Sequence, residues 1–218
     1  MLVGGQQSER RMKTPVDIER NVAFYSGLIE KHGECFKALN WGSLESQQLR
    51  FSILAQAGNL NGKTILDVGC GMGDFYRWLS DNKINVNYTG IDITPKMVEI
   101  ARKRFPQASI RVENILDLPC RHEPRYDYVF CSGLFYFNRS NPLDFMEKMI
   151  TRLFDESNEC LAFNSLSSWS ARKDAKEFHA DPLTTLEFCK TLSARIVFRH
   201  DYHSGDFTIY LYKRRYQS

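Results

Sequence analysis

The residues with the clearest chemical potential surround a short glycine loop. The loop follows an apolar stretch, 63–68, and leads into a helical pattern at 74–79. It reads Asp67-Val68-Gly69-Cys70-Gly71-Met72-Gly73-Asp74. Glycines between a strand and a helix let the backbone turn sharply and approach a bound ligand closely. The sequence therefore predicts a ligand-binding loop at the carboxyl end of a strand.

The charges around this loop indicate which ligand it holds. Asp67 precedes the loop, and Asp74 occupies the position at which a dinucleotide fingerprint has its third glycine. Two unit charges about 4 Å apart interact by about 4 kcal/mol at an effective dielectric constant of about 20. Carboxylates here therefore disfavour a phosphate and favour an ammonium or sulfonium group. The sequence Gly-x-x-x-x-Gly-Lys is absent, which excludes a Walker-type ATPase.

A further carboxylate, Asp92, ends the next predicted strand, nineteen residues after Gly73. A carboxylate at about this spacing can accept hydrogen bonds from both hydroxyls of a ribose. The implied ligand has a ribose, no phosphate and a positively charged end, and S-adenosylmethionine (SAM) fits this description. Taken one at a time, Asp67 and Asp92 could also be solvated residues at strand ends beside ordinary turns.

At this point the sequence resembles the class I SAM-dependent methyltransferases, over about residues 60–165. Residues 65–73 resemble the first motif of that family, 90–97 the second, 114–119 the third and 126–132 the fourth strand. The family often has Asp-Ala where this chain has Asn114-Ile115. An asparagine oxygen can still accept a hydrogen bond from the adenine amino group. More weakly, the N-terminal helices and Asp201-Tyr202-His203 resemble small bacterial methyltransferases of unassigned substrate.

The resemblance implies roles for most of these residues. Separately, the six cysteines contain no C-x-x-C pair and the five histidines show no zinc spacing, so no metal is expected. The methionine end of SAM would be held by Asp67, Gly69, Cys70, Gly71 and Gly73, and the ribose by Asp92. Adenine would be flanked by Ile93, Asn114, Ile115 and Leu116, and the segment beneath the cofactor would be Cys131, Ser132 and Gly133.

Three residues of the N-terminal helices are candidates for covering the cofactor. Arg50 could pair with the SAM carboxylate, and Trp41 could cover the sulfonium through a cation–π contact. Tyr25 lies on the predicted helix 17–31 and could close the site from above. The alternative is that all three only pack two helices against the sheet.

The methyl acceptor should lie over the carboxyl ends of the strands, where open α/β sheets bind ligands. Candidates after the fourth strand are Phe135, Tyr136, Asn138 and Arg139. Methyl transfer from a sulfonium depends mainly on alignment, so a base is needed only for a protonated acceptor. Tyr136 and His203 are the catalytic candidates, and His203 could take a proton at neutral pH. The alternative for His203 is a polar hairpin corner.

The elements that must position these residues alternate along the chain. Strands are expected at 63–68, 86–91, 109–112, 126–131, 160–163, 194–200 and 207–213, and helices at 17–31, 43–58, 74–79, 94–105, 142–154 and 182–192. Alternation of this kind predicts an α/β fold with a doubly wound, seven-stranded, mostly parallel sheet, the Rossmann-like methyltransferase fold. The last two strands are too close for a crossover helix and must pair antiparallel. We expect a helical lid at 1–60 within the same domain and a methyltransferase domain at 61–218.

Composition narrows the function classes further. Of the 218 residues, 43% are hydrophobic, which is enough for a core. A membrane-spanning helix needs about 20 consecutive apolar residues, and no apolar run here exceeds four. The formal charge of +3 is too mild to indicate nucleic acid. The N-terminal residues lack an apolar signal segment, so a cytoplasmic location is expected, and a homodimer is left open.

The leading interpretation is an enzyme that transfers the methyl group of SAM to nitrogen, oxygen or sulfur of a small molecule. One alternative is an aminopropyltransferase that uses decarboxylated SAM. Such an enzyme needs acidic residues to bind a polyamine, and the net positive charge of the chain does not favour this. Another is a non-catalytic module that binds SAM or a protein partner. The complete loop with both carboxylates argues against decay of the cofactor site.

Overall fold

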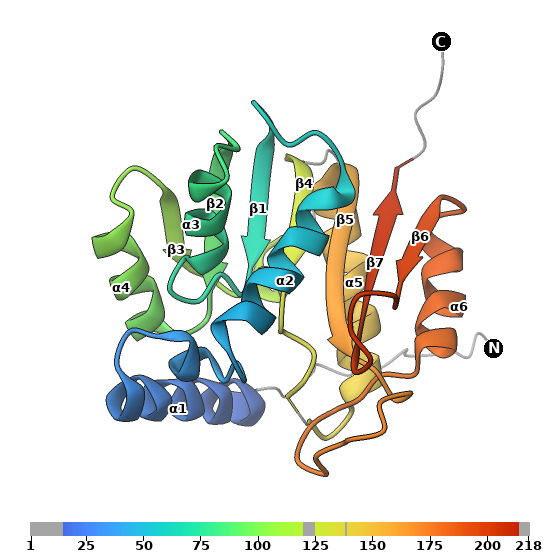
Figure 1. Ribbon diagram of the computed structural model, residues 1–218, viewed down its shortest axis with the longest axis horizontal. Helices are drawn as coiled ribbons and strands as arrows, with labels where there is room; N and C mark the ends of the chain where they lie inside the picture. The colour runs from blue at the N-terminus through green and yellow to red at the C-terminus, as the bar shows by residue number, and fades with distance from the viewer. Residues whose placement is uncertain (1–14, 120–124, 138, 214–218) are drawn as a thin grey trace, which may run out of the picture.

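The computed structural model describes residues 15–119, 125–137 and 139–213. It confirms the expected fold, a seven-stranded sheet with the order β3-β2-β1-β4-β5-β7-β6 (Figure 1). The strands are β1 (Thr64–Val68), β2 (Asn87–Asp92), β3 (Ser109–Val112), β4 (Tyr126–Cys131), β5 (Ser157–Leu166), β6 (Ile196–Arg199) and β7 (Asp206–Tyr212). The first five pair in parallel, and β7 pairs antiparallel with both β5 and β6.

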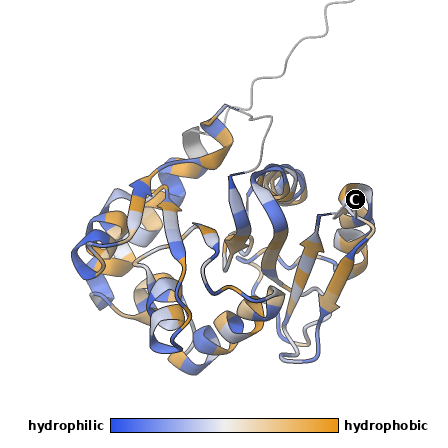
Figure 2. Cartoon of the chain, turned by 90° about the horizontal axis from the view of Figure 1, so that it is seen from above, coloured by the Kyte–Doolittle hydropathy of each residue, from blue (hydrophilic) through white to orange (hydrophobic). Residues whose placement is uncertain are grey.

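Helices pack on both faces of the sheet. The helices are α1 (Pro15–His32), α2 (Leu44–Leu54), α3 (Asp74–Asp81), α4 (Pro95–Arg104), α5 (Pro142–Glu156) and α6 (Pro182–Leu192), with short 3-10 turns at Phe36–Leu39, Ala55–Ala57 and Ile115–Asp117. One core cluster joins α2, α3 and α4 to the strands, and the other joins α5 and α6 to them. Coloured by hydropathy, the helices carry orange and blue residues side by side, as expected when one face is buried (Figure 2).

The helix α1 lies at the end of the sheet at which β1 ends, below the carboxyl end of β1 in Figure 1. It is held there by a small apolar cluster that joins Ile29 to Met97 and Ile100 of α4 and to Ala38. Because the parallel strands all end at this edge, the polar residues at their carboxyl ends lie beneath α1. No helix in the described part of the chain is both long and apolar enough to cross a membrane.

Most helices and strands begin and end within a few residues of the bounds expected from the sequence. The Ser43 hydroxyl caps α2, since it accepts from the Ser46 N–H at 3.1 Å. At the start of α4 the Thr94 hydroxyl makes no capping bond, and the Thr94 N–H donates to Asp92 Oδ1 at 2.8 Å. The strand expected at 160–163 runs over Ser157–Leu166, because β4 and β7 flank it and satisfy its polar backbone on both sides.

The central strands should carry most of the stability. Leu161 of β5 is fully buried, whereas Leu183 of α6 is 58% exposed. We predict that Leu161→Ala lowers the free energy of unfolding by about 2–5 kcal/mol, because it leaves a cavity in the core. The matched variant Leu183→Ala should change it by less than about 0.5 kcal/mol. Urea denaturation of both variants checks the prediction, and equal effects would contradict this placement of the core.

Candidate functional site

The glycine loop between β1 and α3 adopts a backbone that only glycine tolerates well. Gly71 and Gly73 have φ values of +53° and +80°, in the left-handed region. A Cβ on Gly71 would lie 2.8 Å from Leu39 Cδ2, and one on Gly73 would lie 2.9 Å from the Phe105 ring. The loop is therefore fixed both by its conformation and by the packing around it.

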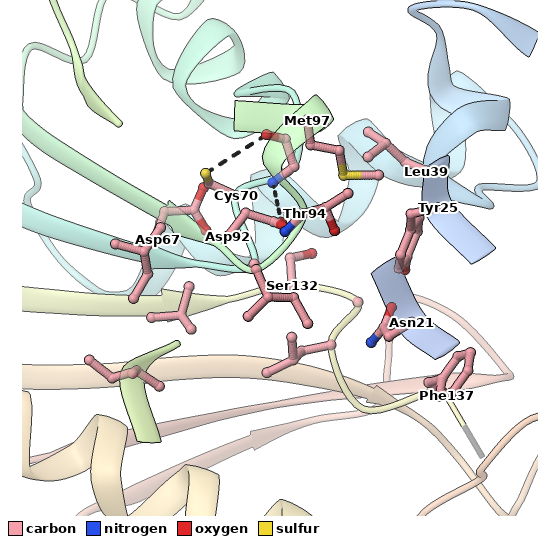
Figure 3. A pocket seen from close by; sticks show the side chains of 18 of the residues that line it. Asn21, Tyr25, Leu39, Asp67, Cys70, Asp92, Thr94, Met97, Ser132 and Phe137 are labelled. Atoms are coloured by element: carbon pink, nitrogen blue, oxygen red, sulfur yellow. Dashed lines mark hydrogen bonds between the residues drawn. The ribbon is translucent and has the colours of Figure 1, made fainter. Parts of the chain in front are cut away.

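The loop opens into a cavity of about 300 Å³ beneath α1. Most of the residues singled out in the sequence line it, although they come from six separate segments of the chain. These residues are Tyr25, Trp41, Asp67, Gly69, Cys70, Gly71, Asp92, Ile93, Asn114, Ile115, Leu116, Ser132, Gly133 and Tyr136. In Figure 3, Asp67, Cys70 and Asp92 lie at one end, and Asn21, Tyr25 and Phe137 lie at the other.

The acidic end is built by Asp67 and Asp92, at the ends of neighbouring strands. Asp67 accepts a hydrogen bond from the Tyr88 hydroxyl at 2.6 Å. Asp92 accepts from the backbone N–H groups of Gly71 at 3.0 Å and Thr94 at 2.8 Å. These contacts fix both carboxylates in the wall of the cavity.

Both carboxylates are almost completely buried, and burial changes their acidity. Loss of hydration raises the pKa of Asp67 to about 7, against the opposing effect of the Tyr88 hydrogen bond. Burial also raises the pKa of Asp92, and the two backbone hydrogen bonds act in the opposite direction. A cation bound between these groups would therefore be matched by two carboxylates that have little water around them.

Beside the acidic end, the cavity is lined by the segment between β2 and α4, by α4 itself and by the turn after β3. Ile93, Met97, Ile115 and Leu116 all line the cavity. Asn114 Oδ1 accepts from the Leu116 N–H at 3.2 Å, and its Nδ2 donates to Asp117 Oδ2 at 2.9 Å. Asn114 thus shapes the 3-10 turn, and its oxygen keeps a second lone pair for a ligand.

The segment after β4 is held by a residue that the sequence did not single out. Asn164 of β5 accepts from the Gly133 N–H at 2.9 Å and donates to Ser132 Oγ at 3.1 Å. Gln47 of α2 is another residue that the sequence did not single out. It contacts the glycine loop side of the cavity, because its Nε2 donates to Asp74 Oδ2 at 3.4 Å. Neither belongs to a sequence motif, and only the packing of strands and helices reveals them.

Two of the predicted residues lie outside the cavity lining and are used elsewhere. Arg50 was expected at the cofactor carboxylate, but its buried guanidinium pairs with Asp206 at the start of β7. His203 was expected near the reacting atoms, but it lies on the β6–β7 hairpin with Nδ1 3.0 Å from Asp206 Oδ2. The hairpin strands β7 and β6 lie two and three places beyond β4 in the sheet, which carries His203 away from the acidic end.

Arg50 nevertheless acts on the site through Trp41. Its guanidinium carbon lies 5.1 Å from the centre of the Trp41 ring, and the ring faces Gly133. A Cβ on Gly133 would lie 3.1 Å from Trp41 Cζ2, and the φ of +67° at Gly133 also disfavours other residues, so a substitution there would strain the backbone and shift the ring. Gly73 and Cys131 also lie outside the lining; Gly73 begins α3, and Cys131 is buried at the end of β4.

The far end of the cavity is closed by two phenols. The hydroxyls of Tyr25 and Tyr136 lie 2.8 Å apart, joining α1 to the segment after β4. Burial raises the pKa of both groups, so both stay protonated at neutral pH. Asn138, a further candidate from the sequence, lies outside the described residues.

Comparisons with known proteins extend these observations. A model of the family described as a methyltransferase domain matches residues 65–155. A methyltransferase of Mycobacterium tuberculosis (strain ATCC 25618 / H37Rv), named without a substrate, is 31% identical over 158 residues, which cover 69% of this chain and 93% of the relative.

Solved structures share the fold. Magnesium protoporphyrin IX methyltransferase from Synechocystis PCC 6803 with bound SAM matches with a TM-score of 0.60 at 17% identity, over 93% of this chain and 92% of that chain. The complex of DhpI with S-adenosylhomocysteine (SAH) matches with a TM-score of 0.63 at 16% identity, over 88% and 95%. At this level of identity the likeness concerns the fold alone.

The raised pKa of Asp67 predicts that SAH binds with a pH-dependent affinity. The ammonium group of SAH should favour the ionised carboxylate, so binding should release a proton and strengthen as pH rises through about 7. Between pH 6 and pH 8 we expect roughly a tenfold gain in affinity. Calorimetry at several pH values gives the dissociation constant, and calorimetry in buffers of different ionisation enthalpy gives the number of protons released on binding.

The matched controls are Asp67→Asn, which should bind more weakly and without this pH dependence, and Asp81→Asn on the exposed end of α3. The Asp81 variant should behave like the unaltered chain. A pH-independent affinity in the unaltered chain would show that Asp67 is not the group that meets the ammonium.

Proposed function

The chain belongs to the class I SAM-dependent methyltransferases, and on this premise we propose that it methylates a small molecule held beneath α1. The observation that carries the proposal is one continuous cavity with two unlike ends, joined by the segment after β4. The acidic end suits the cofactor. The end between Tyr25, Tyr136 and Phe137 suits an organic acceptor.

The residues at the acidic end fit SAM in charge and in shape. We assign the methionine end to Asp67 and the glycine loop, and the ribose to Asp92. Each Asp92 oxygen accepts one backbone N–H bond and keeps a lone pair for a hydroxyl. The Thr94 hydroxyl is buried at this end and has no hydrogen-bond partner among the described residues, so a bound ligand could supply one.

Adenine is assigned to the apolar wall between Ile93, Ile115 and Leu116. These side chains come from two turns that follow neighbouring strands, so they can lie on either side of a flat ring. Ser132 and Gly133 then run beneath the middle of the cofactor, held by Asn164.

Bound SAM supplies a methyl group on a positively charged sulfur, which an aligned nucleophile can attack directly. The contribution of the protein is therefore orientation and exclusion of water, and orientation can lower a barrier by up to about 7–11 kcal/mol. Trp41 and Tyr25 cover the cavity from the side of the N-terminal helices. They are the residues that we propose exclude water.

Tyr136 remains the candidate that touches the acceptor, and its chemistry is restricted. Because burial raises its pKa, the phenol is a poor base at neutral pH and a good hydrogen-bond partner. We propose that Tyr136 orients the acceptor rather than deprotonating it, and that His203 has a structural role in the hairpin. The cytoplasmic location, the homodimer and the division at residue 60 stay predictions.

An aminopropyltransferase would bind a polyamine where the acceptor lies. Among the described residues that line this end of the cavity, the charged side chain beside Phe137 is Arg139, which is positive. This charge disfavours a polyamine, so the methyl-transfer reading is retained.

The assignment of Asp92 to the ribose predicts a large loss of SAH affinity in Asp92→Ala. Two hydrogen bonds from hydroxyls to a carboxylate contribute about 1.5 kcal/mol or more each, so the affinity should fall by roughly two orders of magnitude. Asp81→Ala, on the exposed end of α3, is the control and should bind normally. Thermal unfolding of both variants separates lost binding from lost folding.

The proposed acceptor class is tested by label transfer. The purified chain is incubated with SAM labelled in its methyl group and with a cell extract divided into molecules below and above about 1 kDa. We expect label in the small-molecule fraction, and much weaker transfer with Asp92→Ala at a SAM concentration that does not saturate the variant. Label confined to protein or nucleic acid would overturn the small-molecule acceptor while leaving the methyltransferase family intact.

A further inference from the structure

The charges around the cavity are strongly segregated. Among the described residues that line it, the only Lys or Arg is Arg139. The acidic lining residues are Asp67, Asp74, Asp92, Glu113 and Asp117. All five acidic residues lie on β1, β2, α3 or the turn after β3, whereas Arg139 lies between β4 and α5. A molecule that fits this end of the cavity therefore meets a lone positive charge.

Arg139 is held in place by aromatic rings. Its guanidinium carbon lies 3.9 Å from the centre of the Phe145 ring and 5.8 Å from that of Phe137. Within the described part of the chain, no hydrogen bond or ion pair uses its donors. Stacking orients a guanidinium while leaving its in-plane N–H groups available for an oxyanion.

The surroundings leave the charge of Arg139 only partly compensated. The side chain is half-buried, and loss of hydration lowers its pKa despite the nearby Asp17 carboxylate and Tyr25 phenol. Asp17 itself lies 3.8 Å from Arg20, on the same face of α1. A bound anion would compensate the Arg139 charge more directly.

The remaining lining at this end is largely apolar or aromatic. Ile18 and Phe137 face the cavity together with Tyr25. Figure 3 shows the Asn21 amide between Tyr25 and Phe137, and its buried Oδ1 accepts no hydrogen bond from the described residues. Such an oxygen calls for a donor on the bound molecule.

We propose that Arg139 determines acceptor specificity by binding an oxyanion, carboxylate or phosphate, on a molecule with an apolar body. The inference rests on the proposed function, because it concerns the acceptor end of that cavity. In this arrangement the apolar body contacts Phe137 and Tyr25, and the oxyanion lies in the plane of the guanidinium.

The competing reading is that Arg139 binds the carboxylate of the cofactor itself. The glycine loop leads into α3, which packs on one face of the sheet, whereas Phe145 belongs to α5 on the other face. Arg139 packs on Phe145 of α5 and lies beside Phe137, at the end of the cavity opposite Asp67 and Cys70. This placement favours the acceptor, and the experiment separates the two readings.

The experiment titrates three small probes into the full chain saturated with SAH. The probes are benzoate, phenyl phosphate and benzamide, which share a ring and differ in the charged group. Ligand-detected NMR measures each dissociation constant. We expect benzoate or phenyl phosphate to bind at least tenfold more tightly than benzamide, and the stronger of the two identifies the oxyanion.

Variants assign the preference to Arg139. Arg139→Gln should weaken the preferred anion at least tenfold without changing benzamide or SAH, and Arg139→Lys should restore part of the affinity. The matched control is Arg77→Gln, because Arg77 also lies over a phenylalanine, 5.9 Å from the ring of Phe105, but is exposed and outside the cavity lining. The comparison of probes on the unaltered chain needs no variant, so it stands even if one fails to fold.

Three results would overturn the inference, and they are distinguishable. Equal binding of benzoate, phenyl phosphate and benzamide would show that the site has no preference for an oxyanion. Normal SAH binding in the same experiment would leave the proposed function standing. Loss of SAH affinity in Arg139→Gln would assign the residue to the cofactor. Failure of the unaltered chain to bind SAH would remove the proposed function and this inference together.

Discussion

The site depends on two carboxylates kept out of water at the ends of adjacent parallel strands. Asp67 and Asp92 are 2% and 8% exposed, and burial raises the pKa of each. An isolated protein gains little stability from such a pair, because each charge has lost hydration without gaining a cation. Under the proposed function, the positively charged end of the cofactor would compensate the charge of Asp67, and the ribose hydroxyls would donate hydrogen bonds to Asp92.

Holding this pair requires backbone that few residues can adopt. The glycine loop turns through left-handed conformations and places the Gly71 N–H 3.0 Å from Asp92. The first carboxylate is fixed differently, by the Tyr88 hydroxyl from the neighbouring strand. The strand ends, the loop and the β2 strand thus act as one unit, in which a change to any glycine also displaces a charge.

The C-terminal hairpin supports the site from a distance. Asp206 pairs with Arg50, and the Arg50 guanidinium lies over Trp41, which closes on Gly133. Removal of one partner of a buried ion pair leaves an uncompensated charge, which commonly costs about 3–5 kcal/mol. The hairpin is therefore coupled to the wall of the cavity, although neither His203 nor Asp206 lines it.

The sequence by itself determined the order of strands and helices along the chain, the glycine loop, and the two acidic residues at the carboxyl ends of β1 and β2. These features are local: periodicity, turn residues and the position of a charge at the end of an apolar run are all encoded within a few residues. For the same reason the sequence identified the glycine loop and about half of the cavity lining, including Tyr25, Trp41 and Tyr136.

Only the tertiary structure decided which distant residues meet. Asn164 holds the segment after β4, Asp206 takes Arg50 away from the cavity, and Arg139 alone faces it as a cation among the described lining residues. Each outcome depends on which strands are neighbours and which helix crosses their ends. Such contacts join residues up to 156 positions apart, and no local pattern specifies them.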